Sequence, residues 1–386
     1  MALELETRQL PSLGLYVHVP FCRVRCPFCP FYVQVHRERA IRLYLDALKR
    51  ELHFYAKMPV FQGVPISTVY IGGGTPTTLA IAELQELLGW IRNSFPIMGD
   101  TEVSIEAHPG TVSGGGLKDL LSAGVNRLSL GIQSFDTQEL KSLGGRILAG
   151  EASVMVEEAR SAGFQNINLD LMYGFPGHTL QAWQHTLDMA IRSVPEHLSC
   201  YAFTVEEGTQ VQDDISRGVV PMPDGTFQLR LEEEALQKLA ESGYERYEIS
   251  NFCRPGRACR HNLRYWRGDA YLGLGPSAQS YVGGVRFGNI PDLQSYQRIL
   301  LERQLPLDTW EPLTEGQIER EEVVFGLRLT KGVPLHGLSV ELQVDEGWNR
   351  GVQSMREKGF LNIKDGYLRL TPTGIQYADT VAVALL

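Results

Sequence analysis

Residues 21–29 have the sequence Phe-Cys-Arg-Val-Arg-Cys-Pro-Phe-Cys and follow a short apolar run at 15–19. The apolar run predicts a buried strand, and the C-x3-C-x2-C spacing places Cys22, Cys26 and Cys29 in the loop after it. Three thiolates this close together suit an iron–sulfur cluster, which takes cysteine sulfur as its protein ligand. A [4Fe–4S] cube has four irons, so three cysteines leave one iron open for an exchangeable ligand.

Zinc and disulfides are the alternative uses of these cysteines. A structural zinc site has four ligands, usually as two spaced pairs, and the chain has no second C-x2-C pair. A disulfide framework is typical of short secreted chains, whereas this chain has 386 residues, six cysteines and no secretory-signal pattern. The spacing therefore favours the cluster, with both alternatives still open.

Length and charge limit the class of protein. A chain of 386 residues exceeds the usual size of one domain, which favours a large domain plus a smaller one. The net charge of −9, from 36 basic and 45 acidic residues, argues against a nucleic-acid surface and against attraction to anionic lipid. No apolar run is long enough to span a membrane. Because the cysteine use also fits a reducing compartment, we expect a cytoplasmic protein.

Strand and helix signals alternate regularly after the cysteine loop. Short β-rich runs follow at 68–71, 102–107, 127–131, 166–171 and 197–203. Helical patterns are found at 41–56, 82–95, 116–123, 154–162 and 180–194. With the first strand this predicts an α/β fold, a partial (β/α)6 TIM-like barrel with a parallel sheet. In such barrels the chemistry gathers at the carboxyl ends of the strands, where the cysteine loop also falls.

The pattern changes in the last third of the chain. A helix is predicted at 226–242 and a strand at 244–249, and residues 250–290 are rich in Gly, Arg and aromatics without clear periodicity. Helices and a hairpin around Asp365-Gly366 then predict a small winged-helix-like α+β domain. No dense basic patch accompanies it, so docking or scaffolding is favoured over DNA binding. We divide the chain into a barrel at 1–245, a segment at 246–310 covering the barrel mouth, and a C-terminal domain at 311–386.

Further motifs follow the cysteine loop in a fixed order. The triplet in Gly72-Gly-Gly-Thr-Pro76 indicates either a tight turn or close approach of backbone to a ligand. The others are Ile105-Glu-Ala-His-Pro-Gly110, Leu130-Gly-Ile-Gln-Ser-Phe135, Asn168-Leu-Asp-Leu-Met-Tyr-Gly-Phe-Pro176, Tyr247-Glu-Ile-Ser-Asn-Phe252, His261-Asn-Leu-Arg-Tyr-Trp266 and Leu272-Gly-Leu-Gly-Pro-Ser-Ala278. Together they resemble the radical S-adenosylmethionine (SAM) superfamily, and within it the group that contains the oxygen-independent coproporphyrinogen dehydrogenase and the haem chaperone HemW.

The resemblance implies roles for individual residues. It implies that Cys22, Cys26 and Cys29 ligate the cluster and that the open iron binds the amino and carboxylate groups of SAM. It implies a first SAM lined by Tyr16, Phe28, Gly73, Glu106 and Ala202. For a second SAM it implies Gly74, Thr75, Gln133 and Asp170. From residue type alone, the alternative for Glu106 and Asp170 is a solvated strand end or a structural ion pair.

The resemblance also implies a reaction and a partner. The reaction is reductive cleavage of SAM to a 5′-deoxyadenosyl radical, and the partner is an electron donor such as flavodoxin or ferredoxin. The sequence itself names no catalytic residue.

Two positions point to the haem-handling side of the group. The porphyrinogen enzyme has a further cysteine two residues after the third ligand, whereas this chain has Phe31, as HemW-like proteins do. The motif that begins at His261 resembles a haem-associated motif, and an imidazole is a sound axial ligand for haem iron. The alternative is a loop-fixing histidine. We expect a HemW-like protein that binds haem and passes it to an acceptor protein.

Two departures from the family pattern keep other functions open. The arginine of Leu143-Gly-Gly-Arg-Ile-Leu148, Arg146, is displaced by one residue and the expected histidine after it is missing. In Ser277-Ala-Gln279, Gln279 replaces a histidine, and an amide cannot ligate iron or relay a proton as imidazole can. Because these changes lie around the substrate or second-SAM pocket, they put a standard second SAM site in doubt. They also leave open an alternative function, a radical SAM methyltransferase or another C–C bond-forming enzyme that has a small-molecule substrate and uses two SAM molecules. A non-catalytic iron–sulfur protein is the third alternative.

Overall fold

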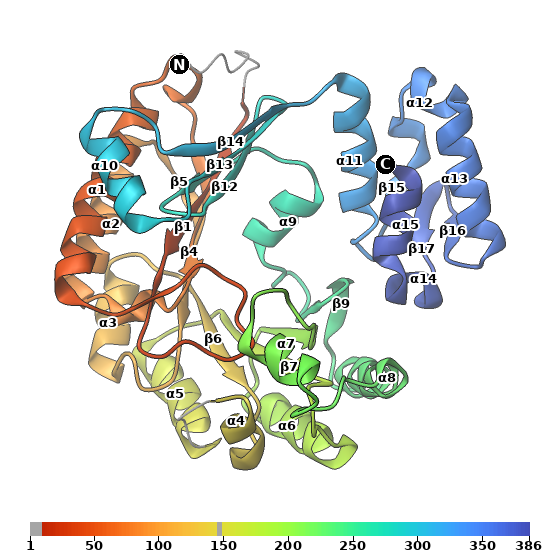
Figure 1. The fold of residues 1–386 in the computed structure, drawn as a ribbon, viewed down its shortest axis with the longest axis horizontal. Helices are drawn as coiled ribbons and strands as arrows, with labels where there is room; N and C mark the ends of the chain where they lie inside the picture. Colours follow the sequence, from red (N-terminus) through yellow and green to blue (C-terminus); the bar gives the residue numbers. More distant parts are fainter. Residues whose placement is uncertain (1–9, 145–148) are drawn as a thin grey trace.

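The computed structural model describes residues 10–144 and 149–386, and a twelve-stranded sheet runs through the larger part of them. Figure 1 shows this sheet with helices along one side and a smaller helical body at the C-terminal end. The strand order is β14-β13-β12-β11-β1-β4-β5-β6-β7-β8-β10-β9.

Six consecutive parallel strands form the middle of the sheet. They are β1 (Leu13–Val19), β4 (Ile66–Gly73), β5 (Ile97–Ala107), β6 (Arg127–Gln133), β7 (Ile167–Tyr173) and β8 (His197–Ala202). The helices among them are α1 (Glu38–Ala56), α2 (Ile81–Ser94), α3 (Gly114–Ser122), α4 (Thr137–Ser142), α5 (Ala149–Ala162) and α6 (Leu180–Arg192). The predicted (β/α)6 arrangement is therefore confirmed.

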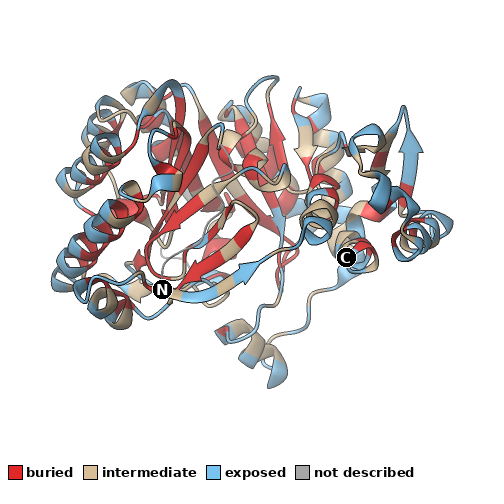
Figure 2. Ribbon diagram, turned by 90° about the horizontal axis from the view of Figure 1, so that it is seen from above, coloured by how far each residue is buried: buried red, intermediate tan, exposed pale blue. Residues whose placement is uncertain are grey.

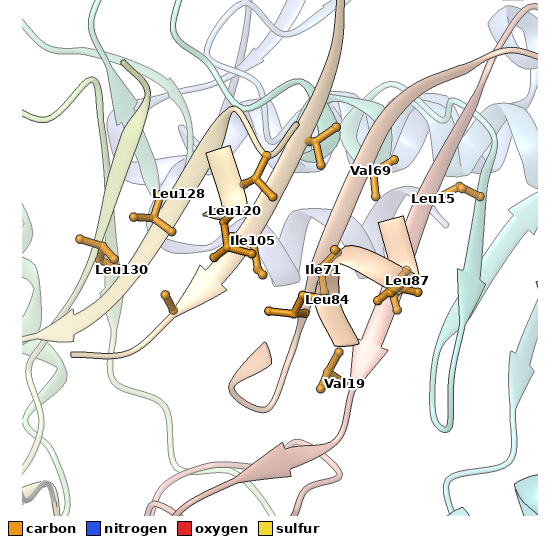
Figure 3. Close-up of a cluster of buried hydrophobic side chains, with 14 of the residues drawn as sticks. Leu15, Val19, Val69, Ile71, Leu84, Leu87, Ile105, Leu120, Leu128 and Leu130 are labelled. Carbon is orange, nitrogen blue, oxygen red and sulfur yellow. The ribbon is translucent and has the colours of Figure 1, made fainter. Parts of the chain in front are cut away.

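Period-two alternation in these strands separates an apolar face from a polar one. In register, Leu15 of β1 lies opposite Val69 of β4, which lies opposite Val103 of β5. These side chains pack against α2 and α3, and Figure 3 shows Leu84 and Leu87 of α2 and Leu120 of α3 among them. Figure 2 shows the same division across the molecule, with buried strands inside and exposed outer helix surfaces. Burial of aliphatic side chains on one face leaves the other face free for polar groups.

The sheet continues beyond the six strands at both edges. Of the added strands, the sequence predicted only the one at 244–249, which is β9. β11 (Tyr271–Leu274) pairs parallel to β1, and β12 (Gln279–Val282), β13 (Val285–Asn289) and β14 (Leu307–Pro312) follow as antiparallel strands. At the other edge β10 (Asn251–Cys253) and β9 (Glu245–Glu248) pair antiparallel to β8. The intervening helices are α7 (Gln210–Ser216), α8 (Gly225–Glu241), α9 (Arg260–Trp266) and α10 (Leu293–Leu301). The strands in 250–290 have three to five residues each, too few to show periodicity.

The C-terminal part has its own small core. Its elements are α11 (Glu315–Gly326), β15 (Val333–Pro334), α12 (Val340–Val344), α13 (Glu346–Glu357), β16 (Leu361–Lys364), β17 (Tyr367–Leu370), α14 (Pro372–Gln376) and α15 (Ala378–Leu385). Leu342, Trp348 and Leu368 are buried in a cluster separate from the barrel core. The predicted hairpin is present, with Asp365 and Gly366 both at positive φ, as a two-residue turn requires. The winged-helix-like prediction is confirmed, and the three-segment division stays an interpretation.

Short elements complete the chain: β2 (Phe21–Cys22), β3 (Gln34–Val35) and the 3-10 turns η1 (Pro59–Phe61), η2 (Pro76–Thr78) and η3 (Leu335–Gly337). Within residues 10–144 and 149–386, none of the helices combines the length and the apolar character needed to cross a membrane.

Candidate functional site

The polar face of the parallel strands carries a connected set of side chains. The Tyr70 hydroxyl donates to Glu106, and Asp170 accepts from Ser129 and Tyr201. α9 lies on this face, because its first backbone amides, at Arg260 and His261, donate to Glu102 of β5. A carboxylate there is favourable, since the free N–H groups of a helix begin at that end. Nothing in the local sequence indicates this role for Glu102, because more than 150 residues separate it from α9.

The cysteine loop leaves the carboxyl end of β1 and folds back on itself. Phe21 pairs with Gln34 and Cys22 with Val35 in the β2–β3 ladder, and the Cys29 amide donates to the Cys26 carbonyl at 3.2 Å. Cys22, Cys26 and Cys29 are all partly exposed, whereas Cys200, Cys253 and Cys259 are buried. All six are free thiols in this structure.

The three loop thiols lie near enough to influence one another. Burial and, to a smaller extent, the neighbouring Cys29 and Cys22 together raise the pKa of Cys26 to about 11. Burial also raises the pKa of Cys22 and of Cys29. Thiolates that repel one another are stabilised by bound cations, so this donor set fits an iron–sulfur cluster. Among the described residues, no group of three His, Cys, Asp or Glu side chains is arranged to hold a single metal ion, and this includes the three loop cysteines.

The glycine triplet lies directly against the loop backbone. The Gly74 and Thr75 amides donate to the Val19 and Phe21 carbonyls at 2.8 and 2.7 Å, and the Thr75 hydroxyl lies 3.6 Å from the Cys22 sulfur. A Cβ on Gly74 would approach the Phe21 carbonyl oxygen to 2.6 Å. Gly73 has φ +108°, and a Cβ there would meet the His18 imidazole at 2.5 Å. Glycine is therefore required at positions 73 and 74, because a larger residue would collide with His18 or with the backbone of the cysteine loop.

Glu106 is held at the end of β5 by two donors. Its Oε1 accepts from the Tyr70 hydroxyl at 2.9 Å and its Oε2 from the Gly73 amide at 3.1 Å. Burial raises the pKa of Glu106 to about 7, and the nearby Asp170 adds to that shift. An approaching cation would favour the ionised form, so the side chain suits a ligand that carries an ammonium or a sulfonium.

Asp170 is more fully engaged within the chain. Its Oδ1 accepts from Asn168 at 2.8 Å and Tyr201 at 3.1 Å, and its Oδ2 accepts from Ser129 at 3.1 Å. Three internal donors give this carboxylate a structural role in joining β6, β7 and β8.

The other predicted SAM contacts lie around the same strand ends. The hydroxyl of Tyr16, on β1, lies 3.2 Å from Nδ1 of His18. Phe28 packs into an apolar cluster with Leu143, Met172, Phe175 and Phe203. Gln133 ends β6 in a left-handed conformation with φ 61°, and its side-chain amide is placed to donate to the Gly131 carbonyl at 3.0 Å. Ala202 ends β8 and is exposed. Arg146 lies outside the described residues.

Gln279 is separated from these residues. It is exposed on β12, and two strands, β11 and β1, lie between it and β4. The structure thus brings the predicted first-SAM residues to one edge of the sheet and leaves Gln279 in the antiparallel extension.

His261 is buried in α9 with both ring nitrogens occupied. Its Nδ1 lies 2.8 Å from the Thr68 hydroxyl and its Nε2 2.8 Å from the Tyr265 hydroxyl. Burial lowers the pKa of His261 to about 3, with Arg264 and Arg127 adding to the effect. The imidazole is therefore neutral at physiological pH. In the described conformation it can bind a metal only after one of these hydrogen bonds breaks, a constraint that the sequence did not show.

Behind Tyr265 lies a cavity that the sequence did not predict. It has a volume of about 210 Å³ and is lined by aromatic residues of α9, β11 and β12 and by side chains of α11. The aromatic residues are Tyr265, Trp266, Tyr271, Tyr281 and Phe325. Arg286, which pairs with Glu311 and Glu321, and Glu322 supply the polar wall. The sequence shows that residues 265–281 are rich in aromatic side chains. Only the folded structure shows which of these side chains line the same cavity.

Known proteins resemble the chain along nearly its whole length. Residues 16–190 match the Radical SAM superfamily and residues 313–377 match the HemN C-terminal domain. The heme chaperone HemW of Bacillus subtilis is 34% identical over 96% of this chain and 98% of its own. The heme chaperone HemW of Escherichia coli is 37% identical over 71% of each chain.

A solved structure has the same architecture. That structure, coproporphyrinogen III oxidase (HemN) of Escherichia coli, described as a radical SAM enzyme, superimposes with a TM-score of 0.86. It is 27% identical in sequence, and the match covers 98% of this chain and 91% of that one. The fold inferred above therefore agrees with an independently solved structure.

Proposed function

The chain belongs to the HemW family of radical SAM proteins, and we propose that it binds haem and delivers it to an acceptor protein. The observation that carries the proposal is the extent of the similarity to heme chaperones, which includes the barrel, the residues around α9 and the C-terminal domain. The position of Phe31, where the porphyrinogen enzyme has a cysteine, supports the same choice.

A [4Fe–4S] cluster and SAM follow from membership of the radical SAM superfamily. We propose that Cys22, Cys26 and Cys29 hold the cluster, because they are the three partly exposed thiols and they share one loop. When bound, the cluster supplies one electron for the reductive cleavage of SAM. Three thiols and no further cysteine nearby leave room for SAM at the remaining iron. The unpaired thiols also support a reducing, cytoplasmic location.

We propose one SAM site rather than two. Glu106 and the backbone of Gly73 form one edge of it, and Tyr16 lies beside them on β1. The positions expected for a second SAM are already engaged: the Gly74 and Thr75 amides bind the cysteine loop, and Asp170 accepts three internal hydrogen bonds. The displaced Arg146 supports the same choice.

We propose that haem, as cargo, meets the aromatic cavity behind α9. A volume of about 210 Å³ is below the usual range of roughly 300–1,000 Å³ for pockets that enclose a drug-sized ligand, so only part of the macrocycle would be enclosed. Partial enclosure suits a carrier that must release its cargo. Tyr265 and Trp266 would supply the flat apolar walls.

We propose His261 as the haem ligand, with Tyr265 as its gate. The Nε2 atom of His261 faces the Tyr265 hydroxyl, and Tyr265 lines the cavity. Rotation of the tyrosine would expose a neutral imidazole, the form that ligates iron. The cost of ligation is therefore the loss of one buried hydrogen bond.

Two substitutions test this arrangement by haem titration. His261→Ala should abolish the Soret shift that ligation produces. Tyr265→Phe removes the competing hydroxyl and should tighten haem binding by about 3- to 10-fold, the value of one hydrogen bond. Retention of the Soret shift in a folded His261→Ala variant, or weaker binding in Tyr265→Phe, would contradict the proposed ligand. Circular dichroism and SAM binding check that each variant is folded.

A further inference from the structure

One wall of the aromatic cavity is acidic. Glu321 and Glu322 of α11 line the cavity together with Tyr265 and Trp266 of α9, and we call the two glutamates the acidic wall. α11 is the helix of the C-terminal domain that lies against α9 (Figure 1). Among the described residues that line the cavity, Arg286 is the single cation. The ionised lining therefore carries more negative charge than positive charge.

Arg286 already has two acidic partners. Its Nη2 lies 2.9 Å from Oε2 of Glu311, and its Nη1 lies 3.1 Å from Oε1 of Glu321. A carboxylate of a ligand would have to compete with both glutamates for this guanidinium. Displacing Glu321 would leave an unpaired charge on a side chain that is only 15% exposed, which is unfavourable. Arg286 is therefore poorly placed to bind a further anion.

The negative charges around the acidic wall already repel one another. Burial and, to a smaller extent, the neighbouring Glu319 and Asp269 raise the pKa of Glu322. Burial also raises the pKa of Glu321, although Arg286 opposes this shift. An additional carboxylate inside the cavity would meet the same burial and the same repulsion. The cavity thus disfavours an anionic group.

Two further arginines near the aromatic rings are engaged within the chain. The guanidinium of Arg328 lies 4.3 Å from the centre of the Trp266 ring and 3.6 Å from Glu248. Arg264, which precedes Tyr265 on α9, donates to the Ser67 hydroxyl and to the Ala270 carbonyl. Neither arginine lines the cavity, so neither balances the acidic wall.

These features suit a flat ligand that has one uncharged edge. Haem carries its propionates on one side and only methyl and vinyl groups on the opposite side. We propose that haem enters the cavity with its methyl and vinyl edge, keeps its propionates outside in water, and is selected by the acidic wall over porphyrins with carboxylates on every side. The inference rests on the proposed function, because it concerns the same cavity and the same cargo. Aromatic rings favour the flat apolar edge, and a volume of about 210 Å³ encloses no more than part of the macrocycle.

The acidic wall would act by rejecting the wrong ligand. Coproporphyrin III has a propionate on each of its pyrrole rings, so every edge of the macrocycle is charged. Any orientation therefore brings a carboxylate to Glu321 and Glu322. Like charges in contact disfavour a complex strongly, and such repulsion gives specificity without any added contact to the correct ligand.

Three ferric porphyrins test the inference by titration in the Soret region, in the same dilute detergent. They are haem, haem dimethyl ester, in which both propionates are uncharged, and ferric coproporphyrin III. We expect the dimethyl ester to bind the anaerobically reconstituted wild type within about threefold of haem, because solvated charges contribute little to affinity. Ferric coproporphyrin III should bind at least about tenfold more weakly than haem.

The variant Glu321→Gln/Glu322→Gln removes the charge of the acidic wall and keeps its shape. It should tighten the binding of ferric coproporphyrin III by about tenfold and change haem binding by less than about threefold. The matched control is Glu341→Gln/Glu357→Gln, which changes the net charge equally at exposed positions of α12 and α13 and should match the wild type. Added salt should narrow the preference for haem in the wild type, because it screens the repulsion.

The outcomes separate the acidic wall from the carrier function. Absence of saturable haem binding in the wild type would contradict the proposed function, and the inference would fall with it. In a wild type that binds haem, equal affinity for ferric coproporphyrin III would overturn the acidic wall alone. Binding of the dimethyl ester about tenfold or more weakly than haem would do the same, since it would place the propionates inside the cavity.

The variants supply a second decision. A preference for haem that is unchanged in the folded Glu321→Gln/Glu322→Gln variant would overturn the inference. An equal gain in coproporphyrin binding by the control variant would assign the effect to net charge and overturn it as well. Circular dichroism and SAM binding show whether each variant is folded, and the titrations of the wild type with haem and its dimethyl ester decide the orientation without any substitution.

Discussion

Glu106 shows how a single carboxylate can be prepared for a cationic ligand. Two donors from the neighbouring strand β4 bind both of its oxygens. Burial raises the pKa of Glu106 to about 7, so the ionised form is costly until a cation binds beside it. The residue type and its place at the end of a strand were predictable from sequence. Its donors were not, because Tyr70 and Gly73 meet it only through the pairing of β4 with β5.

Replacing Glu106 should weaken SAM binding and leave the cluster in place. Glu106→Gln keeps the shape and removes the charge, and the loss of a charge-assisted contact is worth about 1.5–3 kcal/mol, or about 10- to 100-fold in affinity. Equilibrium dialysis of SAM against the reconstituted protein measures the affinity, and iron content with visible absorption serves as the control. Unchanged SAM affinity would show that Glu106 does not contact the ligand.

The buried thiols should be dispensable for the cluster. Cys259 donates to Glu102 and Cys253 lies in β10, both shielded from solvent, so neither is placed to share a cluster with the exposed loop. Cys253→Ser/Cys259→Ser should retain the full iron content after anaerobic reconstitution. Substantial loss of iron in this variant would reveal a second metal site.

At the level of elements, one buried carboxylate joins the antiparallel extension to the barrel. Glu51 of α1 accepts from the Gly275 amide at 2.8 Å, the Asn289 amide at 2.5 Å and the Tyr296 hydroxyl at 2.6 Å. These donors come from the loop after β11, from β13 and from α10. The side chain is fully buried, and burial raises the pKa of Glu51 to about 7 despite the three hydrogen bonds.

This shift makes stability depend on pH in a definite direction. The folded protein binds the proton of Glu51 more tightly than the unfolded chain does. Protonated Glu51 therefore stabilises the fold fully below pH 4.5, and this stabilisation is lost as the pH rises through about 7. The free energy of unfolding of the wild type, relative to Glu51→Gln, should fall by about 2–3 kcal/mol between pH 5 and pH 8. Urea unfolding of both proteins at the two pH values measures it, and the other titrating groups cancel in the difference. A pH-independent difference would contradict the raised pKa.

The elements that sequence could predict are those with a local signal. Each of the six β/α units has an apolar strand of at least six residues and a helix behind it, and both periods are visible in the chain. β10, β11 and β12 have only three or four residues and are stabilised by pairing with β8, β1 and β13, so they carry almost no local signal. The hydrogen bond between His261 and Thr68 could not be predicted from local sequence either, because the two residues are 193 positions apart.

At the scale of the whole molecule, two separate cores meet at the aromatic cavity. The barrel core and the C-terminal core are distinct, and α11 of the C-terminal domain contributes Ile318 and Phe325 to the cavity wall behind α9. The cluster loop lies at the carboxyl ends of the strands, whereas the cavity borders Tyr271, the first residue of β11. The proposed cluster and the proposed haem site would therefore lie at different parts of one sheet, with the polar face and α9 between them.

The most direct measurement is a titration of the reconstituted wild-type protein with haem under anaerobic conditions, followed in the Soret region. A protein that carries haem at the cavity should show one saturable site per chain with a shifted Soret band, and its iron–sulfur absorption should persist beside it. Absence of saturable haem binding in a protein that holds its cluster and binds SAM would contradict the carrier function, and a radical SAM methyltransferase would then be the leading interpretation.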